Sequence, residues 1–316
     1  MNEIESAVVN SPESKTVHNF AELRERARAV GPRRVAVVVA DDEVALTASY
    51  GAMKLGIAIP LLVGDQARIR AKITQLGLDA SLETAQVVAA EDPAATAVKL
   101  AREGAVDVLL KGHLRTDELL KAVLDKETGL RTGRLLSDVL LYEDTLDGRR
   151  RLVAITDGGL NVAPNLEQKK QIILNAIEVL RSIGIERPNI AIMSATEAVS
   201  SAFPSTVDAD ALTKMGIAGE FGDAHVYGPV ALDCALLRSA AHAKGVTHEG
   251  AGFADCMVAP NIEAGNLLGK ATKYLGGSQN AHVVVGAKAP VLIPSRVESV
   301  DDKINAIALG VIYATR

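Results

Sequence analysis

Short apolar runs rich in β-branched residues alternate with longer amphipathic segments along most of the chain. The runs that we predict as strands lie at 34–40, 57–64, 106–112, 152–158, 189–195, 224–229, 254–260 and 282–287. Strands that alternate with helical patterns are typical of βαβ units around a largely parallel sheet. The pattern therefore predicts an α/β fold.

Two helices are marked clearly by the sequence. After the loop at 156–164, Asn165 is placed to cap a helix and Gln168 occupies the reciprocal position of a capping box. Apolar residues then follow at helical spacing as far as Gly184. The free N–H groups at this helix start could bind an anion, or the loop could be a plain capped turn. A last helix is predicted at 300–314.

The length of 316 residues favours two domains. Residues 1–16 are polar and aperiodic, which predicts a flexible leader. The polar, turn-prone stretch at 143–151 interrupts the alternation, so we expect a boundary there. The first α/β domain then begins at 17 and ends near 146, and the second covers 147–289.

Composition narrows the class of function. The net charge is −5, only 3% of the residues are aromatic, and Trp is absent, so no nucleic-acid partner is expected. No apolar stretch approaches the ~20 residues that cross a bilayer, so no membrane association is expected either. The first 15 residues lack the basic region of a signal peptide, and Cys234 and Cys256 are too few for a disulfide framework. A cytoplasmic location is expected.

The common sequence motifs for nucleotide binding and metal binding are absent or incomplete in this chain. No G-x-G-x-x-G follows a predicted strand, and "GNLLGKA" at 265–271 has three residues between its glycines where a phosphate loop has four. No pair of histidines has metal-ligand spacing, and G-x-S-x-G is missing. We therefore expect no metal.

Polar loops instead follow many of the predicted strands. If the carboxyl ends of the strands share one edge of the sheet, these loops meet in one cleft. The cleft would hold the cations Lys111, Arg115, Lys270 and Arg296, the donors Thr116, Asn161, Asn266 and Ser295, and the acids Asp157, Glu197 and Asp302. This set suits a phosphorylated or phosphate-like substrate, since Arg binds phosphate with two parallel hydrogen bonds. Taken singly, each of these charges is more often a solvated surface residue, and their position after strand ends is what favours a site.

Several stretches, in one order, resemble the phosphate acetyltransferase and phosphate butyryltransferase family from about residue 20 to the C-terminus. They are "LLKGHLRTDELLKAVLDKETGLRTGRLLSD", "ITDGGLNVAPNLEQKKQIILNAIEVLRSIGI", "MSATEAV", "YGPVALDCAL", "NIEAGNLLGKATKYLGG" and "GAKAPVLIPSR". The sequence at 126–133 and 156–169 is more similar to the butyryltransferase branch than to the acetyltransferase branch.

The resemblance implies transfer of a short acyl group between coenzyme A and inorganic phosphate. It implies two α/β domains with an isocitrate-dehydrogenase-like fold, an active-site cleft between them, and a homodimer. It also implies that residues 290–316 return to the first domain. Coenzyme A and acyl phosphate would be substrates, and no permanently bound cofactor is expected.

By position, the resemblance assigns the family's Ser-Arg pair to Ser295 and Arg296 and its catalytic acid to Asp302. As the base for the coenzyme A thiol, Asp302 would need a raised pKa, which burial could supply. Arg296 would bind phosphoryl oxygens, and Ser295 would donate to the thiol or the tetrahedral oxyanion. Phosphate or coenzyme contacts are expected from Lys111, Thr116, Asn161, Asn266 and Lys270. A further phosphate cation, an Arg in the acetyltransferase branch, corresponds to Lys121, with Arg131 and Arg134 as alternatives.

Other functions stay open. A dehydrogenase of similar fold would use NAD and a metal to oxidise a hydroxy acid, and it would need convergent acids. A family member could instead bind coenzyme A or acyl phosphate without catalysis. The acyl-chain length, the physiological direction and a possible fusion origin of the leader are not decided by the sequence.

Overall fold

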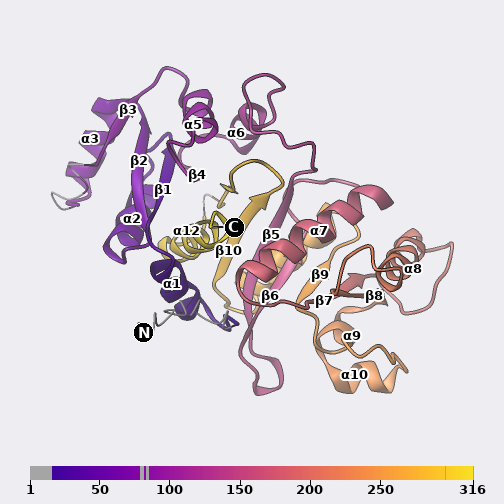
Figure 1. Ribbon diagram of the computed structural model, residues 1–316. Helices are drawn as coiled ribbons and strands as arrows, with labels where there is room; N and C mark the ends of the chain where they lie inside the picture. The colour runs from indigo at the N-terminus through magenta and orange to yellow at the C-terminus, as the bar shows by residue number, and fades with distance from the viewer. Residues whose placement is uncertain (1–15, 79–81, 83–84, 296, 316) are drawn as a thin grey trace, which may run out of the picture.

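The computed structural model describes residues 16–78, 82, 85–295 and 297–315 (Figure 1). In this part of the chain a single sheet of 11 strands has the order β3-β2-β1-β4-β11-β10-β5-β6-β9-β7-β8. The strands are β1 (Arg33–Val38), β2 (Ala58–Gly64), β3 (Val87–Ala89), β4 (Val108–Lys111), β5 (Ser137–Asp144), β6 (Arg151–Thr156), β7 (Asn189–Met193), β8 (His225–Val230), β9 (Cys256–Val258), β10 (Asn280–Val285) and β11 (Val291–Leu292).

Helices lie on both faces of this sheet. They are α1 (Phe20–Ala29), α2 (Glu43–Lys54), α3 (Gln66–Gln75), α5 (Pro93–Arg102), α6 (Thr116–Val123), α7 (Leu166–Ser182), α8 (Pro204–Ile217), α9 (Leu232–Leu236), α10 (Arg238–Ala243), α11 (Ile262–Tyr274) and α12 (Val300–Tyr313), with a 3₁₀ turn at Leu146–Gly148. No described helix is long and apolar enough to cross a membrane.

The α/β fold and all eight predicted strands are confirmed, but β3, β5 and β11 were not predicted. The polar stretch at 143–151 is the end of β5 and the turn that leads into β6, so the chain stays within the sheet at this point. The division into 17–146 plus 290–316 and 147–289 therefore stays a prediction.

The strands do not all run in one direction. β1, β2, β3, β4 and β11 are mutually parallel, and so are β6, β7, β8 and β9. Between these two sets, the pairs β11–β10, β10–β5 and β5–β6 are all antiparallel, which makes three reversals. The two parallel sets therefore run in opposite directions, and the expectation that every carboxyl end shares one edge is wrong.

The two faces of the sheet are covered differently. On one face a single apolar cluster continues across both halves, with Leu46 of α2, Ile307 of α12 and Ile173 of α7 among its members. On the other face there are two separate clusters, one around Leu119 of α6 and one around Cys234 of α9. On this face Val284 of β10 belongs to the first of these clusters and Leu140 of β5 to the second, so the boundary between the clusters lies in the middle of the sheet.

Both predicted helices are confirmed. Asn165 Oδ1 accepts from the Gln168 N–H at 2.9 Å, and Gln168 Oε1 accepts from the Asn165 N–H at 3.0 Å. The last helix, α12, packs against α1 and α2, as Figure 1 shows, and β11 pairs with β4. The end of the chain therefore lies against elements from its beginning.

Candidate active site

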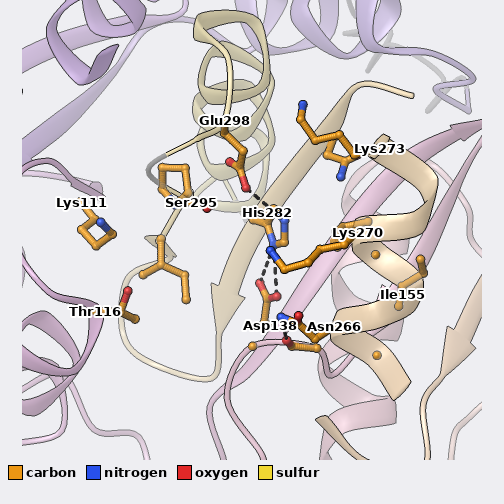
Figure 2. A pocket seen from close by; sticks show the side chains of 18 of the residues that line it. Lys111, Thr116, Asp138, Ile155, Asn266, Lys270, Lys273, His282, Ser295 and Glu298 are labelled. Atoms are coloured by element: carbon orange, nitrogen blue, oxygen red, sulfur yellow. Dashed lines mark hydrogen bonds and ion pairs between the residues drawn. The ribbon is translucent and has the colours of Figure 1, made fainter. Parts of the chain in front are cut away.

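A cavity of about 500 Å³ opens on the face of the sheet that carries the two separate apolar clusters (Figure 2). Residues of β5, β6 and β10 line it from the sheet. The segment from β4 into α6, the loop after β6 with Gly158 and Gly159, the helix α11 and the loop between β11 and α12 complete its lining. The cavity thus brings together segments from both halves of the chain.

Two ionisable side chains of neighbouring strands interact in this cavity. His282 of β10 places Nδ1 at 3.1 Å from Oδ2 of Asp138 on β5, and its Nε2 lies 3.6 Å from Oε1 of Glu298. Figure 2 shows the imidazole between the two carboxylates. Burial alone would lower the pKa of His282, but Asp138, with smaller contributions from Glu298 and Asp302, raises it to about 9.

The loop after β6 is built around a buried carboxylate. Asp157 accepts hydrogen bonds from the N–H groups of Gly159 and Leu160 at 2.8 and 2.9 Å and from the Asn161 amide at 2.5 Å. Burial and the nearby Asp138 raise the pKa of Asp157, against the effect of these donors. Asn161 also donates to the Leu136 carbonyl. Neither Asn161 nor Asp157 lines the cavity, so the predicted substrate contact of Asn161 stays a prediction.

Three lysines contribute positive charge to the cavity. Lys111 is the last residue of β4, is buried, and donates to the Leu114 carbonyl at 3.2 Å. Lys270 and Lys273 come from α11 (Figure 2). Lys273, which the sequence analysis did not single out, forms an ion pair with Asp302.

Thr116 and Asn266 also line the cavity. Thr116 is the first residue of α6, and the Asn266 amide donates to the Gly158 carbonyl at 3.0 Å. The predicted cation Arg115, which pairs with Asp117 at 2.9 Å, lines the cavity as well. The predicted residues Lys111, Arg115, Thr116, Asn266, Lys270 and Ser295 are therefore gathered around one cavity, while their roles stay predictions.

The segment after β11 presents Ser295 to the cavity. Its carbonyl accepts from Lys303 Nζ at 3.3 Å and from the Glu298 N–H at 3.2 Å. Lys303 is itself buried, and burial lowers its pKa. Arg296, the predicted partner of Ser295, lies outside the described residues.

Asp302 does not line the cavity, and its side chain is 1% exposed. Its Oδ2 pairs with Lys273 and accepts from the Ser299 hydroxyl at 2.6 Å, while its Oδ1 accepts from the Asn280 N–H at 2.9 Å. Burial alone would raise its pKa, but these donors outweigh burial and lower it. The expected raised pKa is therefore wrong, and the role of Asp302 as the base stays a prediction.

The remaining candidates lie elsewhere. Glu197 follows β7, which lies with β8 at one end of the sheet, away from the strands that line the cavity. It pairs with Lys244 at 3.2 Å. Neither it nor Lys121, Arg131 or Arg134 lines the cavity, and Arg134 pairs with Glu178 at 2.9 Å. The only cluster of three metal-type ligands within the described ranges is Glu197, Asp233 and Cys234, which is also outside the cavity.

The residues that the strands themselves carry into the cavity were not predicted from the sequence. Asn280 and His282 are two apart on β10 and therefore share one face of the sheet, and Asp138 lies on the adjacent strand. A polar residue at alternate positions of an apolar strand was the available signal. Without the pairing of β5 with β10, that signal did not connect the two strands.

The model of the phosphate acetyl/butaryl transferase family matches residues 79–311. A phosphate butyryltransferase of Clostridium acetobutylicum is 40% identical over 94% of this chain and 99% of its own length. A phosphate acetyltransferase of Rhizobium meliloti is 38% identical over 92% of each. A solved branched-chain phosphotransacylase from Enterococcus faecalis has a TM-score of 0.77 at 28% identity, with coverage of 89% of this chain and 99% of that one.

These matches show that the chain is an enzyme and that it is an acyltransferase. It belongs to the phosphate acetyl/butaryl transferase family. The family resemblance of the sequence motifs is thereby confirmed.

Proposed function

We propose that this enzyme exchanges a short acyl group between coenzyme A and inorganic phosphate, so that acyl-CoA and phosphate give acyl phosphate and free coenzyme A. The observation that carries the proposal is the lining of the cavity, where Lys111, Lys270 and Lys273 lie around Ser295 in a member of this family. Cations suit the phosphate of one substrate and the negative charge that develops on the thioester oxygen.

The proposed chemistry begins with attack of a phosphate oxygen on the thioester carbonyl carbon. The lysines hold the phosphate, and the Ser295 hydroxyl donates to the oxyanion of the tetrahedral intermediate. By the resemblance, Arg296 binds the phosphoryl oxygens. The carbon–sulfur bond then breaks, and the leaving coenzyme A sulfur takes the proton that the attacking phosphate loses, with Asp302 as the acid and base that the resemblance assigns. Coenzyme A and phosphate are then dissociable substrates, and no permanently bound cofactor is required.

The same proposal includes the wider setting of the enzyme: a cytoplasmic homodimer with two α/β units, 17–146 plus 290–316 and 147–289. The acyl group is between acetyl and butyryl in length, because both activities occur in the names of relatives of nearly equal identity. One methylene changes the free energy of binding in such a pocket by only about 1–3 kcal/mol.

A metal-dependent dehydrogenase is the weaker alternative. It would need acids that converge on a metal in the cavity, and the described residues place their one three-ligand cluster elsewhere. Formation of reduced nicotinamide from a hydroxy acid would favour this alternative. A chain that binds coenzyme A without turnover would be the non-catalytic family member.

The test is phosphate-dependent release of free thiol from acetyl-, propionyl- and butyryl-CoA, compared by kcat/KM. We expect turnover with at least one of the three. Arg296→Gln should lower kcat/KM by roughly 10²-fold or more, as loss of one charge-stabilising donor does. Arg150→Gln is the matched control, because Arg150 forms only a surface contact with Glu143. Absence of phosphate-dependent thiol release would contradict the proposed function.

A further inference from the structure

We propose that Lys273 alternates between Asp302 and the phosphate of the substrate, so that binding of phosphate uncovers the base of the reaction. This inference rests on the proposed function and names a step that prepares the same site. Lys273 lines the cavity, whereas its ion-pair partner Asp302 is buried and does not. In the free enzyme the ammonium of Lys273 therefore neutralises the carboxylate that the thiol proton has to reach.

Asp302 is held in place by groups other than Lys273. The hydroxyl and the N–H of Ser299 donate to its Oδ2 at 2.6 and 3.0 Å, and the N–H of Asn280 donates to its Oδ1 at 2.9 Å. These donors are neutral and belong to the start of α12 and to β10. Departure of Lys273 would thus change the electrostatic surroundings of the carboxylate more than its position.

Lys273 is the movable member of the pair. It reaches Asp302 from α11 through a flexible four-carbon stem. Its side chain is 19% exposed, against 1% for Asp302. Figure 2 shows Asn266, Lys270 and Lys273 in succession along α11 beside the cavity. A rotation of this one side chain therefore exchanges a buried partner for one in the cavity.

A bound phosphate competes directly with the carboxylate for the ammonium. Lys111 and Lys270 line the same cavity and attract the anion to it. A phosphate dianion carries two negative charges where Asp302 carries one, and the attraction between ions grows with the product of their charges. Once phosphate lies among the three lysines, the ammonium of Lys273 turns from Asp302 to the phosphoryl oxygens.

The charged groups around Asp302 come from every element packed against it. They are Lys273 of α11, His282 of β10, Glu298 before α12, Lys303 of α12 and, through the neighbouring Asp301, Arg24 of α1. Burial raises the pKa of Asp302, and its donors, Lys273 first, outweigh burial and lower it. When Lys273 turns away, the effect of burial increases and the pKa of Asp302 rises, as a base for a thiol requires.

The proton balance of the reaction closes without another reactant. When acyl phosphate is consumed, the uncovered Asp302 accepts the thiol proton as the carbon–sulfur bond forms and the carbon–oxygen bond to phosphate breaks. The carboxyl group then gives this proton to the leaving group, which departs as hydrogen phosphate. Lys273 returns to Asp302 when the phosphate has left. The reverse reaction retraces this path.

The first test is calorimetric titration of the enzyme with inorganic phosphate near pH 8. Asp302→Asn should tighten phosphate binding by about 5-fold or more, because the ammonium of Lys273 no longer has a competing anion. Lys273→Met should weaken binding by about tenfold or more, as loss of a charge-assisted hydrogen bond does. The double variant should bind phosphate like Lys273→Met alone, because Asp302 acts on phosphate through Lys273.

Two surface ion pairs provide matched controls for these titrations. Asp301 pairs with Arg24 at 2.8 Å, and Lys214 pairs with Asp210 at 2.7 Å on the exposed side of α8. Asp301→Asn and Lys214→Met should bind phosphate like the wild type. Circular dichroism at the titration temperature confirms that each variant is folded.

The second test uses Lys273→Met alone and is independent of the folding of Asp302→Asn. The pH profile of kcat/KM for acyl phosphate reports groups of the enzyme before this substrate binds, and that of kcat reports the complex. Lys273 lowers the pKa of Asp302 before binding, so wild-type kcat/KM should stay level in acid to a lower pH than that of Lys273→Met. The acid limb of kcat should be the same in both enzymes, because Lys273 has left Asp302 in the complex.

Two results would overturn the inference. One is an Asp302→Asn enzyme that binds phosphate no more tightly than the wild type, or that gains as much affinity when Lys273 is Met. The other is a kcat limb that shifts as far as the kcat/KM limb, which a permanent ion pair would give. Wild-type enzyme without any acyl exchange would instead contradict the proposed function, and the phosphate titrations would still test the alternation of Lys273.

Discussion

Asp302 joins three segments that surround the cavity, although its own side chain does not line it. It accepts from Lys273 on α11, from the N–H of Asn280 on β10, and from Ser299 at the start of α12. Ser299 in turn accepts from the Asp302 N–H, which makes a reciprocal cap for the helix. In this conformation the carboxylate positions the strand that carries His282.

Replacement of Asp302 by Asn should therefore destabilise the protein, contrary to a purely catalytic role. An amide cannot pair with the Lys273 ammonium, and removal of one partner of a buried ion pair costs about 3 kcal/mol. Urea unfolding at pH 7, followed by circular dichroism, measures the loss. Because the pKa of Asp302 is lowered on folding, its contribution is present above about pH 4 and is lost as the pH falls through the folded pKa. The gap between wild type and variant should narrow in acid.

The neighbouring Asp301 provides the matched control. It is 57% exposed and pairs with Arg24 at 2.8 Å on the surface. Asp301→Asn should cost less than about 1 kcal/mol at neutral pH. Equal losses of stability in the two variants would contradict the positioning role of Asp302.

At the level of single residues, the sequence identifies loop residues better than strand residues. Lys111, Thr116, Asn266, Lys270 and Ser295 lie at strand ends, in the loops after them or on the helices that follow, and local patterns are enough to mark them. The Asp138–His282 pair depends on the register of β5 with β10, strands that are far apart in the chain. Asp302 could have been recognised as a cap from the spacing Ser299-x-x-Asp302. Its burial, which alone would raise its pKa, and the ion pair with Lys273, which lowers it, are tertiary effects.

At the level of elements, α11 lies unusually close to the loop after β6. Gly265 and Gly269 form its buried face, one turn apart. A methyl group at Gly265 would lie 2.5 Å from the Asp157 carbonyl oxygen, which is backbone and cannot move aside locally. At Gly269 it would lie 3.0 Å from Leu140 Cδ1, a flexible side chain. The glycines of "GNLLGKA" therefore serve close packing of this helix.

Gly265→Ala should push α11 away from the loop, at a cost of roughly 1–3 kcal/mol from overpacking. It should also lower kcat/KM, because Asn266, Lys270 and Lys273 move with the helix. Gly269→Ala is the matched control, since Leu140 can change rotamer and alanine favours helix by up to about 1 kcal/mol over glycine. Thermal unfolding and the thiol-release assay measure both effects. A Gly265→Ala enzyme as stable and active as Gly269→Ala would rule out this packing constraint.

Element order and helix ends are the parts of the fold that the sequence predicts well. Eight strands and the caps of α7 depend on local periodicity and local hydrogen bonds. β5 was missed because its polar ends resemble the turn that follows it, and β11 because it has only two residues. The reversal of direction across β11, β10, β5 and β6 is a property of strand pairing. This reversal cannot be predicted from the sequence alone. Because of it, the candidate site lies on a face of the sheet and not at the edge that was predicted.

At the level of the whole molecule, the sheet connects the two proposed units directly. β11 pairs with β4 on one side and β10 on the other, and β10 pairs with β5. The apolar cluster beneath this region also continues from α2 through α12 to α7. A chain of 316 residues would often unfold domain by domain, but here the units share hydrogen bonds and a core.

We therefore expect both halves to unfold in one cooperative transition. The chain contains no Trp, so one fluorescent probe can be placed in each half, with Tyr50→Trp on α2 and Phe203→Trp before α8. Tyr50 is half-buried and Phe203 is 47% exposed, so the added ring volume has room at both sites. The urea midpoints of the two fluorescence signals and of circular dichroism should coincide, which is the standard test of two-state unfolding. A shared core cannot lose one half while the other half stays intact. Separate midpoints would therefore show that the halves unfold independently and would contradict the shared core.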